Sequence, residues 1–168
     1  MGGTAMLSTN SGLWVFTLPA LATGLLSAPE ARAEDRQICV VAILATDKNT
    51  QVDPRVKCIA EEVQKVEPGL TGFRVAQTSC KGVAVGKRET FALVDSEMLT
   101  VLLQQISGKE GGKDKEGERA RLSVKAPLQG EIAYTTCCSK FFPIMTRYLT
   151  KDNERLIIAI MVKPAKKN

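Results

Sequence analysis

Histidine is absent from this sequence of 168 residues, and aromatic residues are few, with one Trp, two Tyr and five Phe. Without an imidazole, the common nucleophile–base pairs of acyl-transfer enzymes are excluded, and so are most zinc sites. The usual proton shuttle at neutral pH is missing as well. The composition therefore points away from the enzyme classes that depend on histidine.

Two further patterns fall short of a catalytic site. The segment 82–88 places glycines before a lysine, but it lacks the spacing and the Ser or Thr of a phosphate-binding loop. Glu61 and Glu62 fall on the polar side of a predicted helix, whereas a glycosidase needs two carboxylates in one cleft. We therefore expect no catalytic residue, no bound cofactor, no metal ligand and no enzymatic activity.

Apolar runs long enough to span a membrane are also missing from the N-terminal region. The run Leu13–Leu26 has 14 residues, whereas a membrane-spanning helix needs about 20. It is typical of a secretory signal peptide, although no Lys or Arg precedes it. We predict residues 1–33 as this peptide, cleaved between Ala33 and Glu34. The mature chain would be exported, to the periplasm or the exterior, and keep no transmembrane segment; an uncleaved anchor is the alternative.

The mature chain is predicted to be one α+β domain over residues 34–163, followed by a basic tail at 164–168. A helix is predicted over 54–66, because Asp53 is a favoured N-cap, Pro54 suits the first helical position, and apolar residues then recur at helical spacing. The other periodic segments are predicted strands, at 38–45, 73–78, 81–85, 90–94, 98–106, 119–126, 131–138, 142–149 and 156–162.

The predicted fold is one amphipathic helix packed on a curled, mainly antiparallel sheet of about 6–8 strands, in the order β-α-β(n). The runs 38–45 and 156–162 are apolar on both faces, so we place them in the middle of the sheet as potential neighbours. One helix covers only one face. The other face must be closed by curling into a half-barrel or sandwich-like layer, which we favour, by a second subunit in a homodimer, which is the second choice, or by the long hairpin over 98–126. If 38–45 and 73–78 are parallel neighbours, their crossover is right-handed.

The positive charge of the chain is concentrated at its C-terminal end. Lys and Arg exceed Asp and Glu by five, and residues 140–168 alone hold seven basic and two acidic side chains. Lys163, Lys166 and Lys167 are candidates for contact with an anionic surface. A solvated tail is the interpretation we favour, because salt screens such charges over about 8 Å. Specific nucleic-acid binding is not expected, since the nearby aromatic residues lie in strand patterns that face a core.

Five cysteines are the most unusual chemistry in the sequence. In an oxidising compartment, five thiols most often form two bridges and leave one free, but the sequence does not select the pairing. The candidate disulfide or thiol residues are Cys58, Cys80, Cys137 and Cys138, with Cys58 on the polar side of the helix. Cys39 lies in an apolar strand and is predicted to be a small buried hydrophobic residue. The adjacent Cys137 and Cys138 should point to opposite faces of a strand.

Three segments and their order resemble small exported bacterial α+β proteins of unassigned function. These are Val52–Val56 at the start of the helix, Lys140–Ile144 before a strand, and Glu154–Ile160 near the end. The similarity spans about residues 38–163. It implies a strand–helix–multistrand domain and brings no catalytic residue with it.

Two functional hypotheses follow. The first is a non-catalytic binding or structural module of the bacterial envelope or exterior, with an unidentified protein or envelope partner and with homodimerisation left open. The second is a thiol-dependent redox or Cu(I)-handling protein that uses the vicinal pair Cys137–Cys138, because thiolates suit Cu(I) and exchange disulfides.

Overall fold

The computed structural model describes residues 35–108 and 118–163, so the predicted signal peptide and the tail at 164–168 lie outside the described residues. In these two ranges the chain forms eight strands, one α-helix and two short 3-10 helices. No helix in them is both long enough and apolar enough to cross a membrane. The elements in chain order are β1 (Arg36–Thr46), η1 (Pro54–Val56), α1 (Lys57–Val66), β2 (Gly72–Val83), β3 (Arg88–Ala92), η2 (Val94–Ser96), β4 (Met98–Ser107), β5 (Arg119–Lys125), β6 (Glu131–Cys137), β7 (Phe142–Leu149) and β8 (Arg155–Lys163).

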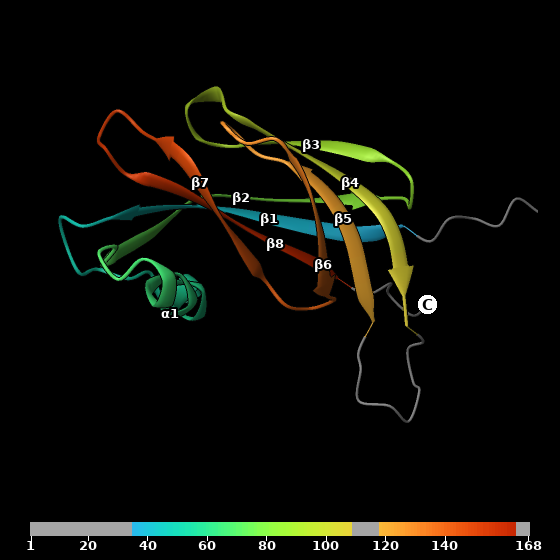
Figure 1. The fold of residues 1–168 in the computed structure, drawn as a ribbon, viewed down its shortest axis with the longest axis horizontal. Coiled ribbons are helices and arrows are strands. Elements are labelled where there is room, and N and C mark those ends of the chain that lie inside the picture. The colour runs from blue at the N-terminus through green and yellow to red at the C-terminus, as the bar shows by residue number, and fades with distance from the viewer. Residues whose placement is uncertain (1–34, 109–117, 164–168) are drawn as a thin grey trace, which may run out of the picture. The chain divides into compact units, whose positions relative to one another are not determined.

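The strands form two sheets of four. The first sheet has the order β2-β1-β8-β7, and the second has the order β3-β4-β5-β6. All neighbouring strands within each sheet are antiparallel. Figure 1 shows β4, β5 and β6 crossing the direction of β1, with α1 beside the first sheet. The mainly antiparallel arrangement with a single helix agrees with the sequence analysis.

The two sheets bury one shared core. Along each contributing strand, every second residue belongs to this core, as the alternation of side chains in a strand requires. The fully buried ring of Phe91 brings β3 into the same core. Most of the other members come from β1, β8, β4 and β5: Ile38, Val40, Ala42, Leu44, Leu156, Ile158, Ile160, Val162, Leu99, Val101, Leu103, Ala120, Leu122 and Val124.

The helix covers the opposite face of the first sheet. A second apolar cluster joins α1 to the alternate residues of β1 and β8, and it consists mainly of Val41, Ile43, Ala45, Ile59, Ala60, Val63, Ile157 and Ala159. The predicted cap is present, because the Asp53 carboxylate accepts a hydrogen bond from the Arg55 N–H at 3.0 Å, but the first turn is the 3-10 helix η1 and the α-helix begins at Lys57. Val66 is the last residue of the apolar spacing that predicts the helix, but its side chain is 66% exposed at the end of α1.

The layout as one sheet is not confirmed, because the strands form two four-stranded sheets. After Val83 the chain leaves the first sheet and reverses through a turn in which Gly86 has a φ of 82°, a value that favours glycine. The next four strands, β3 to β6, pair with one another and pack over the open face of the first sheet. That face is therefore closed by a second sheet of the same chain, which includes the hairpin of β4 and β5.

The connection between β1 and β2 also differs from the parallel crossover that was considered. The chain passes through α1 and returns to the same end of the sheet, where the Thr71 N–H donates to the Thr46 carbonyl at 2.9 Å. β2 then runs back antiparallel to β1 as one long strand, in place of the two predicted at 73–78 and 81–85. β1 and β8 are neighbours, as expected, with Val40 opposite Ile160.

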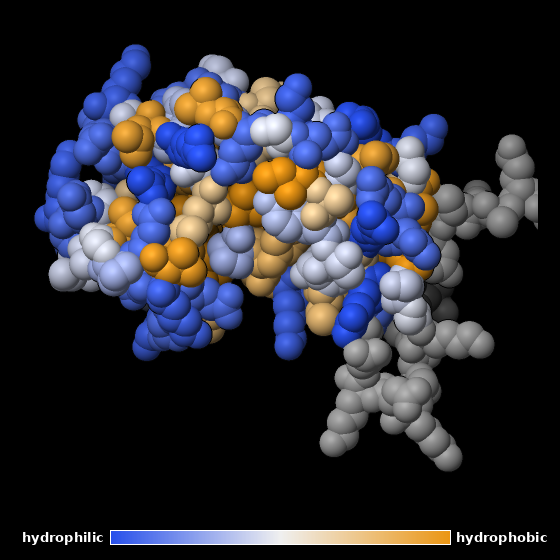
Figure 2. Space-filling view, in the orientation of Figure 1, coloured by the Kyte–Doolittle hydropathy of each residue, from blue (hydrophilic) through white to orange (hydrophobic). Residues whose placement is uncertain are grey.

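Exposed apolar side chains are dispersed over several elements. The four most exposed, at 47–72% exposure, are Val66 in α1, Met98 in β4, Leu128 in the β5–β6 turn and Leu149 in β7. On the face seen in Figure 2, apolar residues lie in separate groups between polar ones. This view gives no broad apolar surface that would mark a hydrophobic docking site.

Replacing Leu103 with Ala should destabilise the fold, because its side chain is fully buried between the sheets. The expected loss of unfolding free energy is about 2–5 kcal/mol. Leu102 is a matched control, since it lies on the same strand, points the other way and is half-buried. Its replacement should cost less than about 1.5 kcal/mol. Urea unfolding followed by circular dichroism measures the unfolding free energy of both variants. Equal losses of stability would contradict the orientation of β4, in which Leu103 faces the core and Leu102 faces away from it.

Candidate functional site

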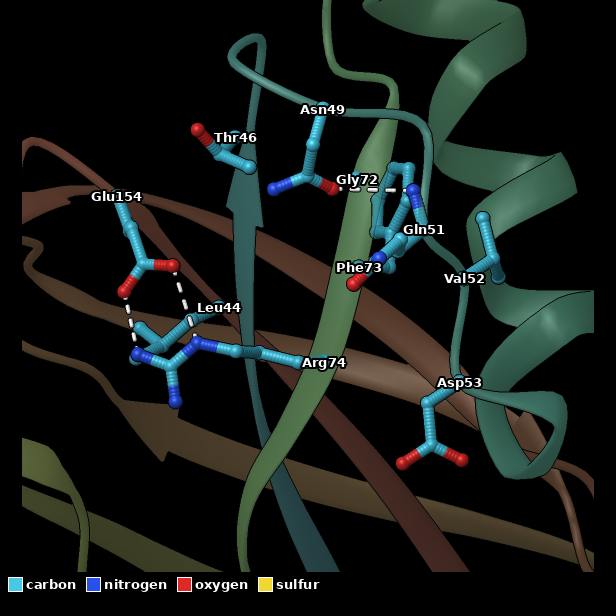
Figure 3. Close-up of a pocket in the computed structure, with 10 residues that line it drawn as sticks. All are labelled: Leu44, Thr46, Asn49, Gln51, Val52, Asp53, Gly72, Phe73, Arg74 and Glu154. Carbon is cyan, nitrogen blue, oxygen red and sulfur yellow. Dashed lines mark hydrogen bonds and ion pairs between the residues drawn. The ribbon is translucent and has the colours of Figure 1, made fainter.

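A polar groove of about 320 Å³ lies where β1 ends and β2 begins (Figure 3). It is bordered by the loop at 49–53, by the start of β2 at 72–74, and by Thr46 and Glu154. None of these positions was singled out as a site by the sequence analysis, which used Asp53 only as a helix cap.

Hydrogen bonds hold the loop of this groove against β2. The Phe73 N–H donates to the Gln51 carbonyl at 2.8 Å, and the Asn49 Oδ1 atom accepts from the Gln51 N–H at 3.0 Å. Gly72 packs directly under Asn49: a Cβ at this position would overlap Asn49 Oδ1 and lie 2.9 Å from Thr46 Cγ2. The missing side chain at position 72 therefore allows the loop to approach the strand.

The charged groups that line the groove are paired. Arg74 binds Glu154 through two hydrogen bonds, from Nε to Oε1 at 3.0 Å and from Nη2 to Oε2 (Figure 3). Asp53 accepts hydrogen bonds from Arg55 Nε at 3.0 Å and Nη2 at 2.6 Å. The side-chain hydrogen bonds from Arg55 lower the pKa of Asp53 from 3.8 to about 2. The hydrogen bond from Arg74 likewise lowers the pKa of Glu154.

This arrangement is unsuited to acid–base catalysis. A carboxyl group that acts as a general acid needs a raised pKa, so that it still holds a proton near neutral pH. The two carboxylates of the groove are ionised at neutral pH, and each is bound to an arginine. Within residues 35–108 and 118–163, no cluster of three or more Cys, Asp or Glu side chains is placed to hold a metal ion.

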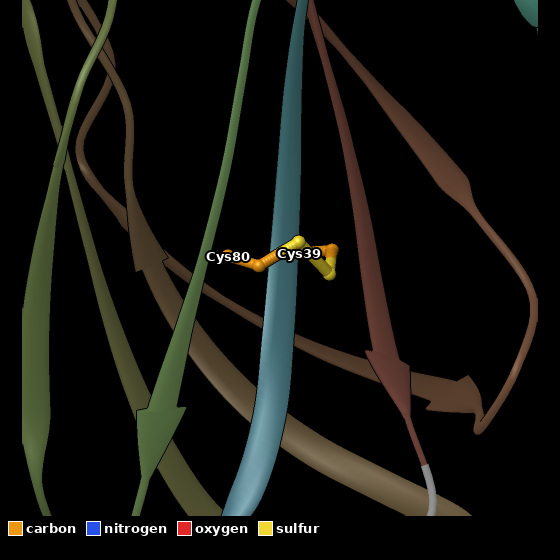
Figure 4. Close-up of a disulfide and its surroundings, with 2 residues drawn as sticks. All are labelled: Cys39 and Cys80. Carbon is orange, nitrogen blue, oxygen red and sulfur yellow. A yellow bond between two sulfur atoms is a disulfide. The ribbon is translucent and has the colours of Figure 1, made fainter.

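Cys39 and Cys80 form a disulfide between β1 and β2 (Figure 4). They are opposite each other in the register of the two strands, with Cα atoms 4.1 Å apart. The prediction that Cys39 is a small unbonded hydrophobic residue is therefore wrong, although the residue is buried. The two cysteines are 41 residues apart in sequence, so their pairing can be predicted only when the register of β1 and β2 is known.

The remaining three cysteines are free thiols, so the expectation of two bridges is wrong. Cys58 is exposed on α1, as its position on the polar side of the helix predicts. Cys137 is exposed, whereas Cys138 is half-buried and packs against the shared core. Burial, together with the charge of Glu118, raises the pKa of Cys138 to about 11. The Cys138 thiol is therefore protonated at neutral pH.

The predicted lysine contact is only partly within the described residues. Lys163 is the last residue of β8, opposite Gln37 of β1, whereas Lys166 and Lys167 lie outside the described residues. The second sheet holds a separate group of cations, because Arg119, Arg121 and Lys125 alternate along β5 with residues of the shared core.

The alternation over 119–126 predicts that one side of this strand is exposed to solvent. The structure confirms this exposure for Arg119, Arg121 and Lys125. Ser123 lies on the same side but is buried, and its hydroxyl donates to Glu131 Oε1 at 2.6 Å. Arg88, at the start of β3, shares this surface because it lies opposite Leu102, whose neighbour across the next pair of strands is Ser123. No pattern in the sequence predicts that alignment.

No protein-family model, curated protein or solved structure matches this chain. The similarity to small exported bacterial proteins stays a prediction. Inferences about function rest on the described residues themselves.

The pKa of Asp53 tests directly whether this carboxylate is paired with Arg55 in the groove. An NMR titration of its carboxyl carbon should give a midpoint at about 2. In the Arg55→Ala variant the midpoint should return toward 3.8, because the largest cause of the shift is the hydrogen bond from that side chain. The ion pair should therefore persist on acidification through pH 4 and be lost only as the pH falls toward 2. A midpoint unchanged by the substitution would show that Arg55 does not hold the carboxylate.

Gly72→Ala should destabilise the protein by about 1–3 kcal/mol, because the added methyl group displaces the Asn49 side chain and breaks its hydrogen bond to Gln51. Gly82→Ala on the same strand is the matched control, since nothing lies within 4 Å of a Cβ there. Thermal unfolding of the two variants measures the difference. If Gly72→Ala is as stable as Gly82→Ala, the close approach of the loop to β2 is contradicted.

Proposed function

We propose that this chain is an exported, non-catalytic module that binds a partner in the bacterial envelope or outside the cell. The main support is the Cys39–Cys80 disulfide between β1 and β2. Disulfides persist in oxidising compartments and are rare in the cytosol, so the bridge favours an exported chain. The predicted signal peptide at 1–33 points to the same location.

The stability that the bridge provides suits a binding framework. It closes a loop of the chain with a sequence separation of 41, and this loop includes α1. In the chain-entropy treatment, closing a loop of that length stabilises the folded state by about 4 kcal/mol. The groove where β1 ends and β2 begins has ionised, arginine-bound carboxylates and is therefore suited to recognition rather than to proton transfer.

The redox or Cu(I) alternative gains no support from the geometry around Cys137 and Cys138. The thiolate is the form that attacks a disulfide and binds a soft metal. A pKa of about 11 keeps Cys138 protonated at neutral pH. Its neighbour Cys137 is exposed while Cys138 packs against the core, so the two thiols occupy different surroundings.

Thiol counting on the protein recovered from its native cells tests the proposal. We expect it in the exported fraction, with an N-terminus at Glu34. Alkylation after denaturation should label three cysteines without reductant and five after reduction, because only Cys39 and Cys80 are bonded to each other. Crosslinking in the intact envelope should then retain a partner.

The variant Cys137→Ser with Cys138→Ser is the matched control, because it keeps the bridge and should retain the partner. An untrimmed chain in the cytosol with five thiols labelled before reduction would contradict the proposal. Partner retention or Cu(I) binding that disappears in the double Ser variant would favour the redox alternative instead.

A further inference from the structure

The second sheet has an outer surface that is rich in cations, which we call the basic face. It comprises Arg88, Arg119, Arg121, Ser123, Lys125 and Glu131. Ala120, Leu122 and Val124 point into the shared core, so the intervening side chains of β5 point away from the first sheet. Arg121 and Lys125 are exposed.

The single carboxylate of the basic face is already engaged. Glu131 Oε1 accepts hydrogen bonds from Arg88 Nη2 at 3.1 Å and from Ser123 Oγ at 2.6 Å. The bond from Ser123 is the main reason that the pKa of Glu131 is lowered, so this carboxylate remains ionised at neutral pH. Within residues 35–108 and 118–163, no carboxylate lies within ion-pair distance of Arg121 or Lys125. Lys125 lies opposite Glu131 and interacts with it electrostatically, but it forms no ion pair with it, so Arg121 and Lys125 can both still contact a partner.

Hydroxyl groups lie beside these cations. Thr100 of β4 is opposite Lys125, and Thr135 of β6 is opposite Arg121. Side chains on one face of a strand repeat every two residues, so Arg119 and Arg121 are about 7 Å apart along β5. The basic face thus presents a row of cations flanked by hydrogen-bonding groups, and it suits an extended partner with repeated negative charges.

The chemistry of the basic face discriminates among anionic partners. The apolar side chains that share this surface are Leu102, which is half-buried, and Ala133, which is small, so there is no large exposed apolar side chain among them to enter a lipid layer or to anchor a protein partner. Nucleobases need aromatic platforms, but Phe91 and Tyr134 of this sheet pack on the core side. A second copy of the chain would present the same positive charge and be repelled. An acidic polysaccharide has the complementary groups, namely carboxylates and hydroxyls.

We infer that the basic face binds a linear acidic polysaccharide through Arg121 and Lys125, with Arg88 and Arg119 at its margins. This inference rests on the proposed function, since export brings the chain into contact with envelope and extracellular glycans. Binding would be electrostatic, so it should weaken as salt increases.

Titration of the mature chain with polygalacturonate, and with neutral dextran as the control ligand, tests the inference. The wild-type chain should bind polygalacturonate and not dextran. Arg121→Glu with Lys125→Glu should weaken binding about tenfold or more, because two attractive contacts become repulsive. Arg121→Gln with Lys125→Gln should weaken it less, and its thermal unfolding shows whether loss of charge alone disturbs the fold.

Lys57→Glu with Lys65→Glu is the matched control, because it makes the same change in net charge on exposed positions of α1. Its affinity should stay within about twofold of the wild type. Equal weakening by both charge reversals, no binding of polygalacturonate, or tighter binding to DNA or to phosphatidylglycerol vesicles would overturn the inference. Those results in a chain that is exported and bridged leave the proposed function intact, whereas a cytosolic chain with reduced Cys39 and Cys80 overturns that function.

Discussion

The burial of two strands on both of their faces is the constraint on which this fold depends. Residues 38–46 of β1 and 156–160 of β8 are buried without interruption. An apolar strand of this kind must be covered on each side, because a face that stays exposed to water does not gain the favourable free energy of burying its apolar side chains. α1 supplies one cover and the second sheet supplies the other. The same pair of strands therefore anchors both apolar clusters.

These two covers leave different surfaces for recognition. α1 exposes a mixture of charges, Lys57, Glu61, Glu62 and Lys65. The second sheet exposes cations on its outer face, and the one carboxylate of that face, Glu131, is bound by Arg88 and Ser123. In the groove where β1 ends and β2 begins, the charged side chains are paired with one another, and a backbone hydrogen bond from Phe73 to Gln51 holds the loop. The outer face of the second sheet is therefore the surface that we propose for recognition of a charged partner, and the framework behind it carries the disulfide.

Local signals in the sequence were sufficient for several parts of this structure. Asp53 and Pro54 predicted where the chain begins to coil, and the alternation over 119–126 predicted the solvent-exposed side of β5. The uninterrupted apolar runs placed β1 and β8 side by side. The second sheet, the Cys39–Cys80 bridge and the arrival of Arg88 beside β5 could not be predicted, because each depends on how distant strands pair. The register of paired strands is set by the packing of the whole core, and a shift of one residue moves every side chain of a strand to the opposite face of the sheet.

Native-state hydrogen exchange tests the double cover of β1 and β8 most directly. If both faces are buried by the same chain, the amides of residues 38–45 and 156–162 should exchange only through global unfolding and be the slowest in the protein. The amides of the edge strand β6 should exchange faster through local opening. Exchange of the 38–45 amides as fast as those of β6 would contradict a core shared by the two sheets.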